Sequence, residues 1–99
     1  MPEHPLKVFE RLDPELLKLV NETSELALAD GALPTKVKIL IAMALDASHG
    51  AVGGVRALAQ MAMQAGATKQ EVAEALRVAQ YVCGVGSVYT AAHAFEGLF

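Results

Sequence analysis

The sequence predicts an all-α fold, a single-domain antiparallel bundle of about five helices. Three observations predict it. Apolar residues recur at intervals of three and four along most of the 99-residue chain. Helix-starting and helix-ending residues separate these periodic segments. No segment combines an alternating apolar and polar pattern with a hairpin turn, as a strand pair would. We divide the chain into an N-terminal arm, residues 1–12, and a helical domain, residues 13–99.

The first long helix is expected from residue 14 to about residue 29. Asp13 is suited to accept a backbone hydrogen bond as N-cap, and Pro14 fits the first helical position because its missing N–H costs nothing there. In the preceding arm, Val8, Phe9 and Leu12 are expected to pin a short helical turn onto the body. Asp30 and Gly31 end the long helix.

The second helix starts near residue 35 and contains the longest apolar run, residues 39–45. A run of this length also fits a buried strand, because periodicity cannot separate the two. Its Ala, Met and Leu content and the lack of a pairing hairpin favour a helix. We expect it to be buried on most of its surface.

Three further helices follow. The first starts near residue 51, after the glycine-rich bend of residues 50–54, and ends at Gly66. The second runs from residue 69 to about residue 83 and starts with a capping box of Thr68 and Glu71. The third starts near residue 87. The expected inward stripe of the first is Val55, Leu58, Ala59 and Ala62. That of the second is Val72, Ala73, Leu76, Ala79 and Cys83.

Composition excludes several classes of protein. The net charge of −3 without a basic cluster argues against a nucleic-acid partner. Charged residues interrupt the apolar run well short of the roughly 20 residues that span a bilayer, so no membrane partner is expected. The lone Cys83 cannot form a disulfide within the chain, which fits the cytoplasm, and the N-terminus lacks the features of a signal peptide.

The hydrophobic share is unusually large for a small domain. It is 54%, with a mean hydropathy of +0.36. A chain this short has a modest core, so the surplus is expected in an interface between subunits. The expected partner is therefore the protein itself, and no cofactor or metal is predicted.

Three segments occur in the order typical of one family. They are ALADGALPTKVKILIAMAL, MQAGATKQEVAEALRVA and YVCGVGSVYTAAHAF. Together they resemble the carboxymuconolactone decarboxylase-like family, which includes the alkylhydroperoxidase D proteins. The resemblance implies an all-α fold and assembly as a homotrimer or homohexamer.

The same resemblance implies where a reactive centre would lie. Redox members carry Cys-x-x-Cys at the start of the third helix, a histidine one turn later and a glutamate on the second helix. Helix N–H groups lower the pKa of such a thiol, so that one sulfur attacks peroxide and the other resolves it. Counted back from Gly66, these positions are Ala51, Gly54 and Leu58, and the glutamate position is Ile39. None of these residues supports that chemistry, and Leu58 also departs from the histidine of the decarboxylases.

The remaining polar candidates lie near the bend or on the last two helices. His49 is a candidate acid/base or anion-binding group beside free helix N–H donors, or a loop histidine facing solvent or a neighbouring subunit. Arg56 is a candidate carboxylate anchor, or a solvated or subunit-bridging charge. Cys83 and His93 are further ligand-binding candidates. The structural alternative for Cys83 is an inert, buried packing residue. His93 has only Glu96, three residues further on, as a partner, and two such ligands are too few for a zinc site.

These observations lead to three hypotheses. The first is a diverged, homo-oligomeric family member without thiol peroxidase chemistry that binds a small apolar or carboxylate ligand in an apolar pocket near His49. The second is a decarboxylase or lactone-type enzyme that uses His49 and Arg56. The third is a structural or partner-binding module. The sequence leaves enzymatic activity open, because the family's catalytic residues are replaced.

Overall fold

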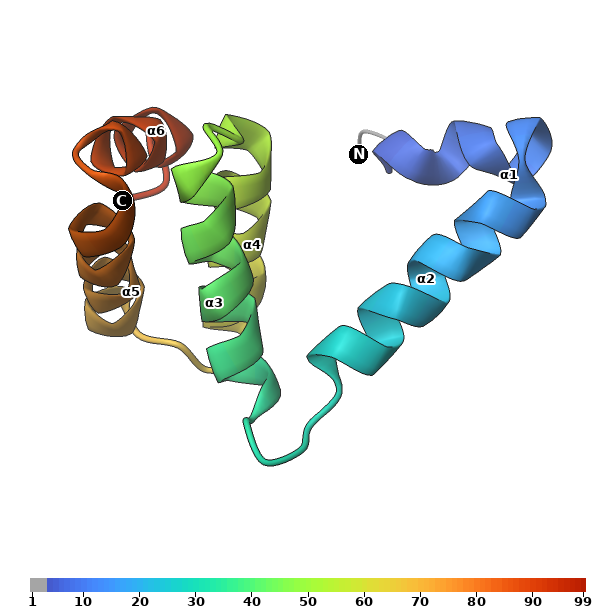
Figure 1. Ribbon diagram of the computed structural model, residues 1–99, viewed down its shortest axis with the longest axis horizontal. Helices are drawn as coiled ribbons and strands as arrows, with labels where there is room; N and C mark the ends of the chain where they lie inside the picture. Colours follow the sequence, from blue (N-terminus) through green and yellow to red (C-terminus); the bar gives the residue numbers. More distant parts are fainter. Residues whose placement is uncertain (1–3) are drawn as a thin grey trace.

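The computed structural model describes residues 4–99 and consists of helices joined by short loops (Figure 1). In chain order the elements are the 3₁₀ helix η1 (Pro5–Val8) and the α-helices α1 (Phe9–Leu12), α2 (Pro14–Leu28), α3 (Thr35–Ser48), α4 (Val52–Gln64), α5 (Lys69–Cys83) and α6 (Gly86–Ala94). The described residues contain no strand. The all-α prediction is confirmed, and the strand alternative for residues 39–45 is wrong.

Local capping chemistry starts the helices where the sequence predicts. The Leu16 N–H donates to Asp13 Oδ1 at 3.0 Å, and Pro14 follows at the first helical position. At the start of α5 the Glu71 N–H donates to Thr68 Oγ1 at 3.0 Å, and the Thr68 N–H donates to Glu71 Oε1 at 2.8 Å. This reciprocal pair is the predicted capping box.

The core lies among α3, α4, α5 and α6. Met43 of α3, Val55 of α4 and Val72 of α5 are its largest fully buried side chains. They pack with small residues of α6, chiefly Ala91 and Ala94. Alanine at these positions allows the helices to approach closely. The predicted inward stripe of α4 is confirmed, because Val55, Ala59 and Ala62 are buried and Leu58 is half-buried.

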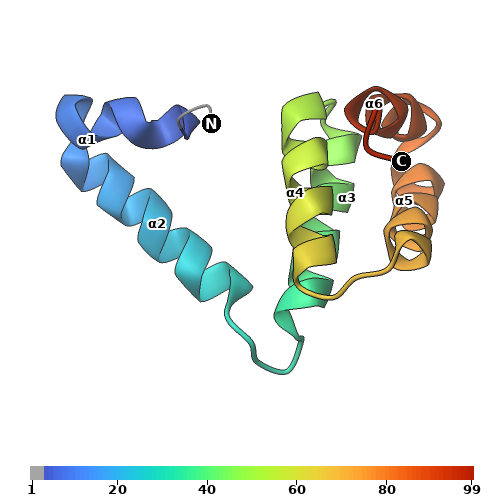
Figure 2. The same ribbon diagram turned by 180° about the vertical axis from the view of Figure 1, so that it is seen from behind.

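The N-terminal helices form an arm that points away from this core (Figures 1 and 2). Val8 and Leu12 are 51% and 70% exposed, so the expectation that they pin a turn onto the body is wrong. A helical turn does form there, but it packs on α2. In space the arm includes α2 as well, and residues 1–3 of the predicted arm lie outside the described residues.

Helix α5 buries less of its predicted stripe than expected. Val72 and Ala79 are buried, whereas Ala73 and Cys83 are exposed. The cause is that α5 packs mainly on α3 and α6, which leaves the side at Ala73 and the last turn at Cys83 open. Within the described part of the chain, no helix is both long and apolar enough to cross a bilayer.

Candidate functional site

The bend between α3 and α4 places three of the predicted site positions, His49, Ala51 and Gly54, at one end of the bundle. His49 closes α3, and its N–H donates to the carbonyls of Leu45 and Asp46 at 3.2 and 3.1 Å. Its side chain is exposed. Ala51 follows as the N-cap of α4, and Gly54 lies in the first turn of that helix. The two positions of the expected cysteine pair therefore occur at a helix N-terminus, as the resemblance implies.

The other two positions of the expected relay lie inside the apolar core. Ile39 is 4% exposed and forms a cluster with Ala62 and Ala67. Leu58 packs against this cluster and against the larger core cluster. Aliphatic side chains thus fill the space where the glutamate and the histidine would exchange a proton.

Asp46 is a residue of this site that sequence reasoning missed. Its carboxylate lies against Gly54, where an added Cβ would overlap the carboxylate oxygen. An anionic group over the first turn of α4 is stabilised by the positive end of that helix. The glycine at position 54 is the one signal in the sequence that could have indicated such close contact.

Arg56 has structural partners in this arrangement. Its Nη1 donates to the carbonyl oxygens of Ala94 at 3.0 Å and of Glu96 at 2.7 Å. Ala94 is the last residue of α6, and Glu96 lies in the turn that follows it, where helix ends leave acceptors without intrahelical donors. The guanidinium thus joins α4 to the end of α6, and its role as carboxylate anchor stays a prediction.

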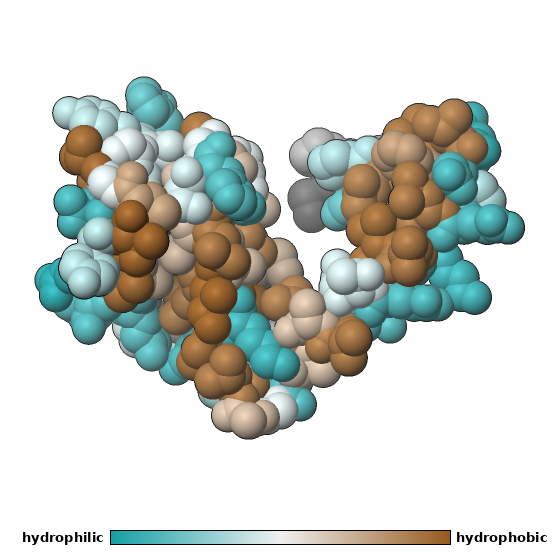
Figure 3. Space-filling model, viewed as in Figure 1, coloured by the Kyte–Doolittle hydropathy of each residue, from teal (hydrophilic) through white to brown (hydrophobic). Residues whose placement is uncertain are grey.

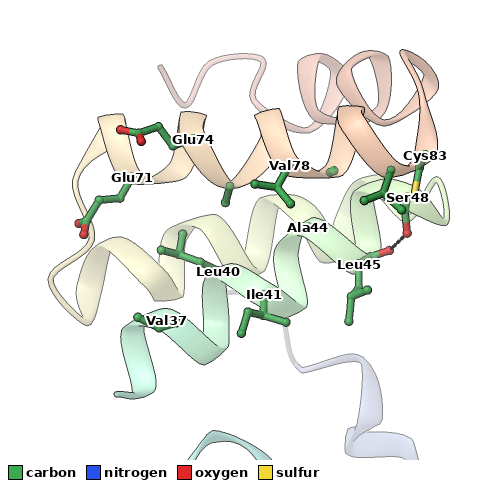
Figure 4. A pocket seen from close by; sticks show the side chains of 13 residues that line it. Val37, Leu40, Ile41, Ala44, Leu45, Ser48, Glu71, Glu74, Val78 and Cys83 are labelled. Carbon is green, nitrogen blue, oxygen red and sulfur yellow. Dashed lines mark hydrogen bonds between the residues drawn. The ribbon is translucent and has the colours of Figure 1, made fainter. Parts of the chain in front are cut away.

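The first of two large apolar grooves lies between α3 and α5 (Figure 4). We call it the α3–α5 groove; its volume is about 550 Å³. Aliphatic side chains such as Leu40, Ile41 and Val78 form its walls. Ser48 and Cys83 lie at one end, and Glu71 and Glu74 at the other. The Ser48 hydroxyl donates to the Leu45 carbonyl at 2.6 Å, so its proton is already engaged.

The second groove lies between α5 and α6 and has a volume of about 560 Å³. We call it the α5–α6 groove. Its apolar lining consists of Val72, Ala73, Leu76, Val88, Phe95 and Phe99. Lys69 and Arg77 are the charged residues of the lining, and none of the acidic residues in the described range 4–99 lines it. The Phe95 and Phe99 rings meet edge to face at 5.0 Å, and the Lys69 Nζ lies 5.8 Å from the Phe99 centroid.

Neither large groove is lined by residues 49–58. The sequence predicted an apolar pocket near His49 between the helices now seen as α3 and α4, whereas the grooves lie on both sides of α5. The two helices on either side of the bend pack closely instead. At the bend the Asp46 carboxylate of α3 lies against Gly54 in the first turn of α4.

The remaining candidates lie apart from each other. Cys83 is exposed at the end of the α3–α5 groove. His93 Nδ1, near the end of α6, lies 3.8 Å from Oε1 of Glu96 in the turn that follows, and both side chains are more than two-thirds exposed. Among the described residues no three His, Cys, Asp or Glu side chains are grouped as metal ligands would be.

Two carboxylates carry perturbed proton affinities, and both stabilise helix starts. The hydrogen bond from the Thr68 N–H lowers the pKa of Glu71 below its ordinary value of 4.5. Lys36 lowers this pKa further, because its Nζ lies 3.0 Å from Glu71 Oε2. The Thr35 N–H donates to Asp30 Oδ1 at 2.8 Å and lowers the pKa of Asp30 in the same way. Hydrogen bonds of this kind favour the charged carboxylate.

Comparison with known proteins gives two matches. The profile of the Carboxymuconolactone decarboxylase family matches residues 14–97. The crystal structure of the apo form of a carboxymuconolactone decarboxylase family protein from Legionella pneumophila is similar to this fold, with a TM-score of 0.86 and 36% sequence identity. The match covers 92% of this chain and 81% of that protein. No curated protein matches the sequence.

Proposed function

The chain belongs to the carboxymuconolactone decarboxylase family, and from this premise we propose that it is a diverged, homo-oligomeric member. In this proposal it binds a small apolar carboxylate and lacks thiol peroxidase chemistry. The observation that supports this ligand is the lining of the α5–α6 groove, which among the described residues combines apolar side chains with two cations and no anion.

The proposed loss of peroxidase chemistry rests on the reacting groups. That reaction needs one thiolate to attack the peroxide and a second thiol to resolve the sulfenic acid. The chain has a single cysteine, Cys83, at the end of α5 and not at the start of α4. Ile39 and Leu58 cannot move a proton, and Asp46 covers the position of the second sulfur at Gly54.

The chemistry of the α5–α6 groove matches an apolar acid. A short aliphatic or aromatic tail would replace water against Val72, Leu76 and Phe95, where burial of apolar area supplies most of the binding energy. Lys69 and Arg77 lie eight residues apart on α5, so either cation can hold a carboxylate at the rim. An exposed ion pair contributes at most about 1 kcal/mol, so the preference for a carboxylate over an uncharged ligand with the same tail is expected to be about fivefold or less.

A thermal-shift titration tests this proposal. Hexanoate is expected to raise the Tm, and hexanol, which has the same tail without a charge, is expected to raise it less. Arg77→Gln and Lys69→Gln should each reduce the hexanoate shift. Arg11→Gln is the matched control, because it removes a cation from the arm. Equal shifts with hexanol and hexanoate, or equal shifts in all variants, would contradict carboxylate selection by this groove.

A peroxide assay tests the proposed lack of thiol peroxidase chemistry. With a dithiol reductant and hydrogen peroxide, the protein is expected to show no turnover above that of its Cys83→Ser variant. Turnover that depends on Cys83 would contradict the proposed loss. The enzymatic alternative based on His49 and Arg56 is less well supported, because the Arg56 guanidinium already binds two carbonyls of the α6 end.

A further inference from the structure

The α5–α6 groove has an aromatic wall, and a cation lies beside it. Phe95 and Phe99 both line the groove and meet edge to face, with their ring centroids 5.0 Å apart. The Lys69 Nζ lies over the Phe99 ring, 5.8 Å from its centroid. Phe99 is 51% exposed, so the wall is accessible to a ligand that enters the groove. An open aromatic surface and a positive charge therefore lie next to each other.

Hydrogen bonds from α4 hold one side of this wall in place. Arg56 Nη1 donates to the carbonyl oxygens of Ala94 at 3.0 Å and of Glu96 at 2.7 Å. These two residues lie directly before and after Phe95 in the chain, so the guanidinium fixes the backbone on both sides of that ring. A wall that is already ordered loses less conformational entropy when a ligand binds.

A tight turn places the second ring against the first. The Leu98 N–H donates to the Phe95 carbonyl at 2.9 Å, and Gly97 within the turn has a φ of +74°. Glycine adopts this left-handed conformation without the steric cost that a side chain would add. The turn returns the chain toward α6, so that Phe99 packs on Phe95 and on no residue of the buried core.

Charge distinguishes this groove from the α3–α5 groove. In Figure 3, brown side chains gather over α3 and α5 and again over the arm, so exposed apolar surface by itself does not identify a ligand site. The α3–α5 groove has Glu71 and Glu74 at one end. The α5–α6 groove has Lys69 and Arg77, and among the described residues no acid lines it. An anion is therefore attracted to the α5–α6 groove and repelled from the other.

Spacing assigns the carboxylate of a short acid to Lys69. Aromatic rings pack with their centroids about 4.5–7 Å apart, so a ligand ring on this wall lies about as far from Phe99 as the Lys69 Nζ does. A carboxylate bonded to that ring then comes within reach of the ammonium, which has no carboxylate partner among the described residues. Arg77 lies eight residues further along α5, about 12 Å along the helix axis, and suits a longer, flexible acid.

From these observations we infer that the α5–α6 groove binds an aromatic carboxylate, with the ring on Phe95 and Phe99 and the carboxylate on Lys69. This assignment rests on the proposed function, and it adds the class of the ligand and the cation that holds it. An alkyl acid of the same size would pair with Lys69 but would lack the favourable interaction between aromatic rings.

Two acids of similar size test the aromatic preference. Benzoate and cyclohexanecarboxylate carry the same charge, but only benzoate is aromatic. In a titration followed by the amide ¹H–¹⁵N shifts of residues 69–73 and 95–99, benzoate is expected to bind the wild-type protein about threefold more tightly. Phe99→Leu keeps an apolar side chain and should bring the ratio of the two Kd values to about one, whereas Phe99→Tyr should keep it near three.

Phe9→Leu is the matched control, because it removes a ring from the N-terminal arm and should leave the ratio of the two Kd values unchanged. Phe99 lies outside the buried core, so its substitution leaves the fold intact. Equal affinity of the wild-type protein for the two acids would overturn the inference. A ratio that Phe99→Leu does not change would overturn it as well.

Charge variants test the assignment of the carboxylate. Lys69→Gln is expected to weaken benzoate binding about threefold, and Arg77→Gln by a smaller factor. Equal factors for the two variants would overturn the assignment to Lys69. Hexanoate separates this inference from the proposed function. A charge-dependent hexanoate shift in Tm without a preference for benzoate over cyclohexanecarboxylate would overturn the aromatic assignment alone. Absence of binding by both hexanoate and benzoate would overturn both.

Discussion

The carboxylate of Asp46 lies against the backbone of Gly54, where any side chain would overlap it. Position 54 is where the resemblance places the second sulfur of redox family members, so the acid and that cysteine cannot share this arrangement. The contact joins the last turns of α3 to the first turn of α4. The glycine is therefore part of the close packing of these two helices, and the anion next to it interacts favourably with the helix N-terminus.

Two neighbouring glycines give a matched test of this contact. Gly53→Ala is expected to stabilise the protein by about 0.5 kcal/mol, because alanine restricts the unfolded chain and nothing lies within 4 Å of the new Cβ. Gly54→Ala should instead be destabilising, because Asp46 must move away from the helix. In an Asp46→Ala background Gly54→Ala should become as favourable as Gly53→Ala. Urea unfolding measures all four variants, and equal effects of the two glycine substitutions would argue against the contact.

Arg56 is expected to contribute to stability through the end of α6. Arg56→Met keeps the aliphatic stem but removes the donor to the Ala94 and Glu96 carbonyls. The expected loss in free energy of unfolding is about 1–2 kcal/mol, since the bonds are charge-assisted but partly solvated. Arg77→Met, an exposed arginine of α5, is the control and should change stability by less than about 0.5 kcal/mol. Equal losses would contradict the capping role.

Much of the fold could be predicted because its signals are local. Asp13 before Pro14, and Thr68 three residues before Glu71, form hydrogen bonds within a single helical turn, and the structure contains both. The inward stripe of α4 follows from spacing alone. The direction of the arm could not be predicted, because periodicity shows that Leu16 and Leu19 share a face but not which surface covers it.

The start of α4 was predicted, whereas the contacts around it and the positions of the two grooves were not. Counting from Gly66 places Ala51 and Gly54 at the start of α4, where the structure has them. The contact of Asp46 with Gly54, and the reach of Arg56 to residues about 40 positions further on, are tertiary contacts without a local signal. Cys83 was expected to be buried, but burial of the last turn of a helix depends on its neighbours, and Cys83 is exposed among the described residues.

The pH dependence of stability should report on Glu71, whose carboxylate joins the start of α5 to α3. Its carboxylate accepts from the Thr68 N–H and faces the Lys36 Nζ of α3 at 3.0 Å. These contacts lower the pKa of the folded state below 4.5, so their contribution is fully present above that value and is lost as the pH falls through the lowered pKa. Glu71→Gln keeps an acceptor oxygen for the cap but removes the charge. The difference in urea midpoint between wild type and Glu71→Gln is therefore expected to be largest at neutral pH and to shrink in acid. Glu74→Gln is the control, because Glu74 lies one turn along α5 and 3.4 Å from Gln70. A difference in urea midpoint between wild type and Glu71→Gln that stays constant from pH 7 to pH 3 would show that the charge does not act in this way.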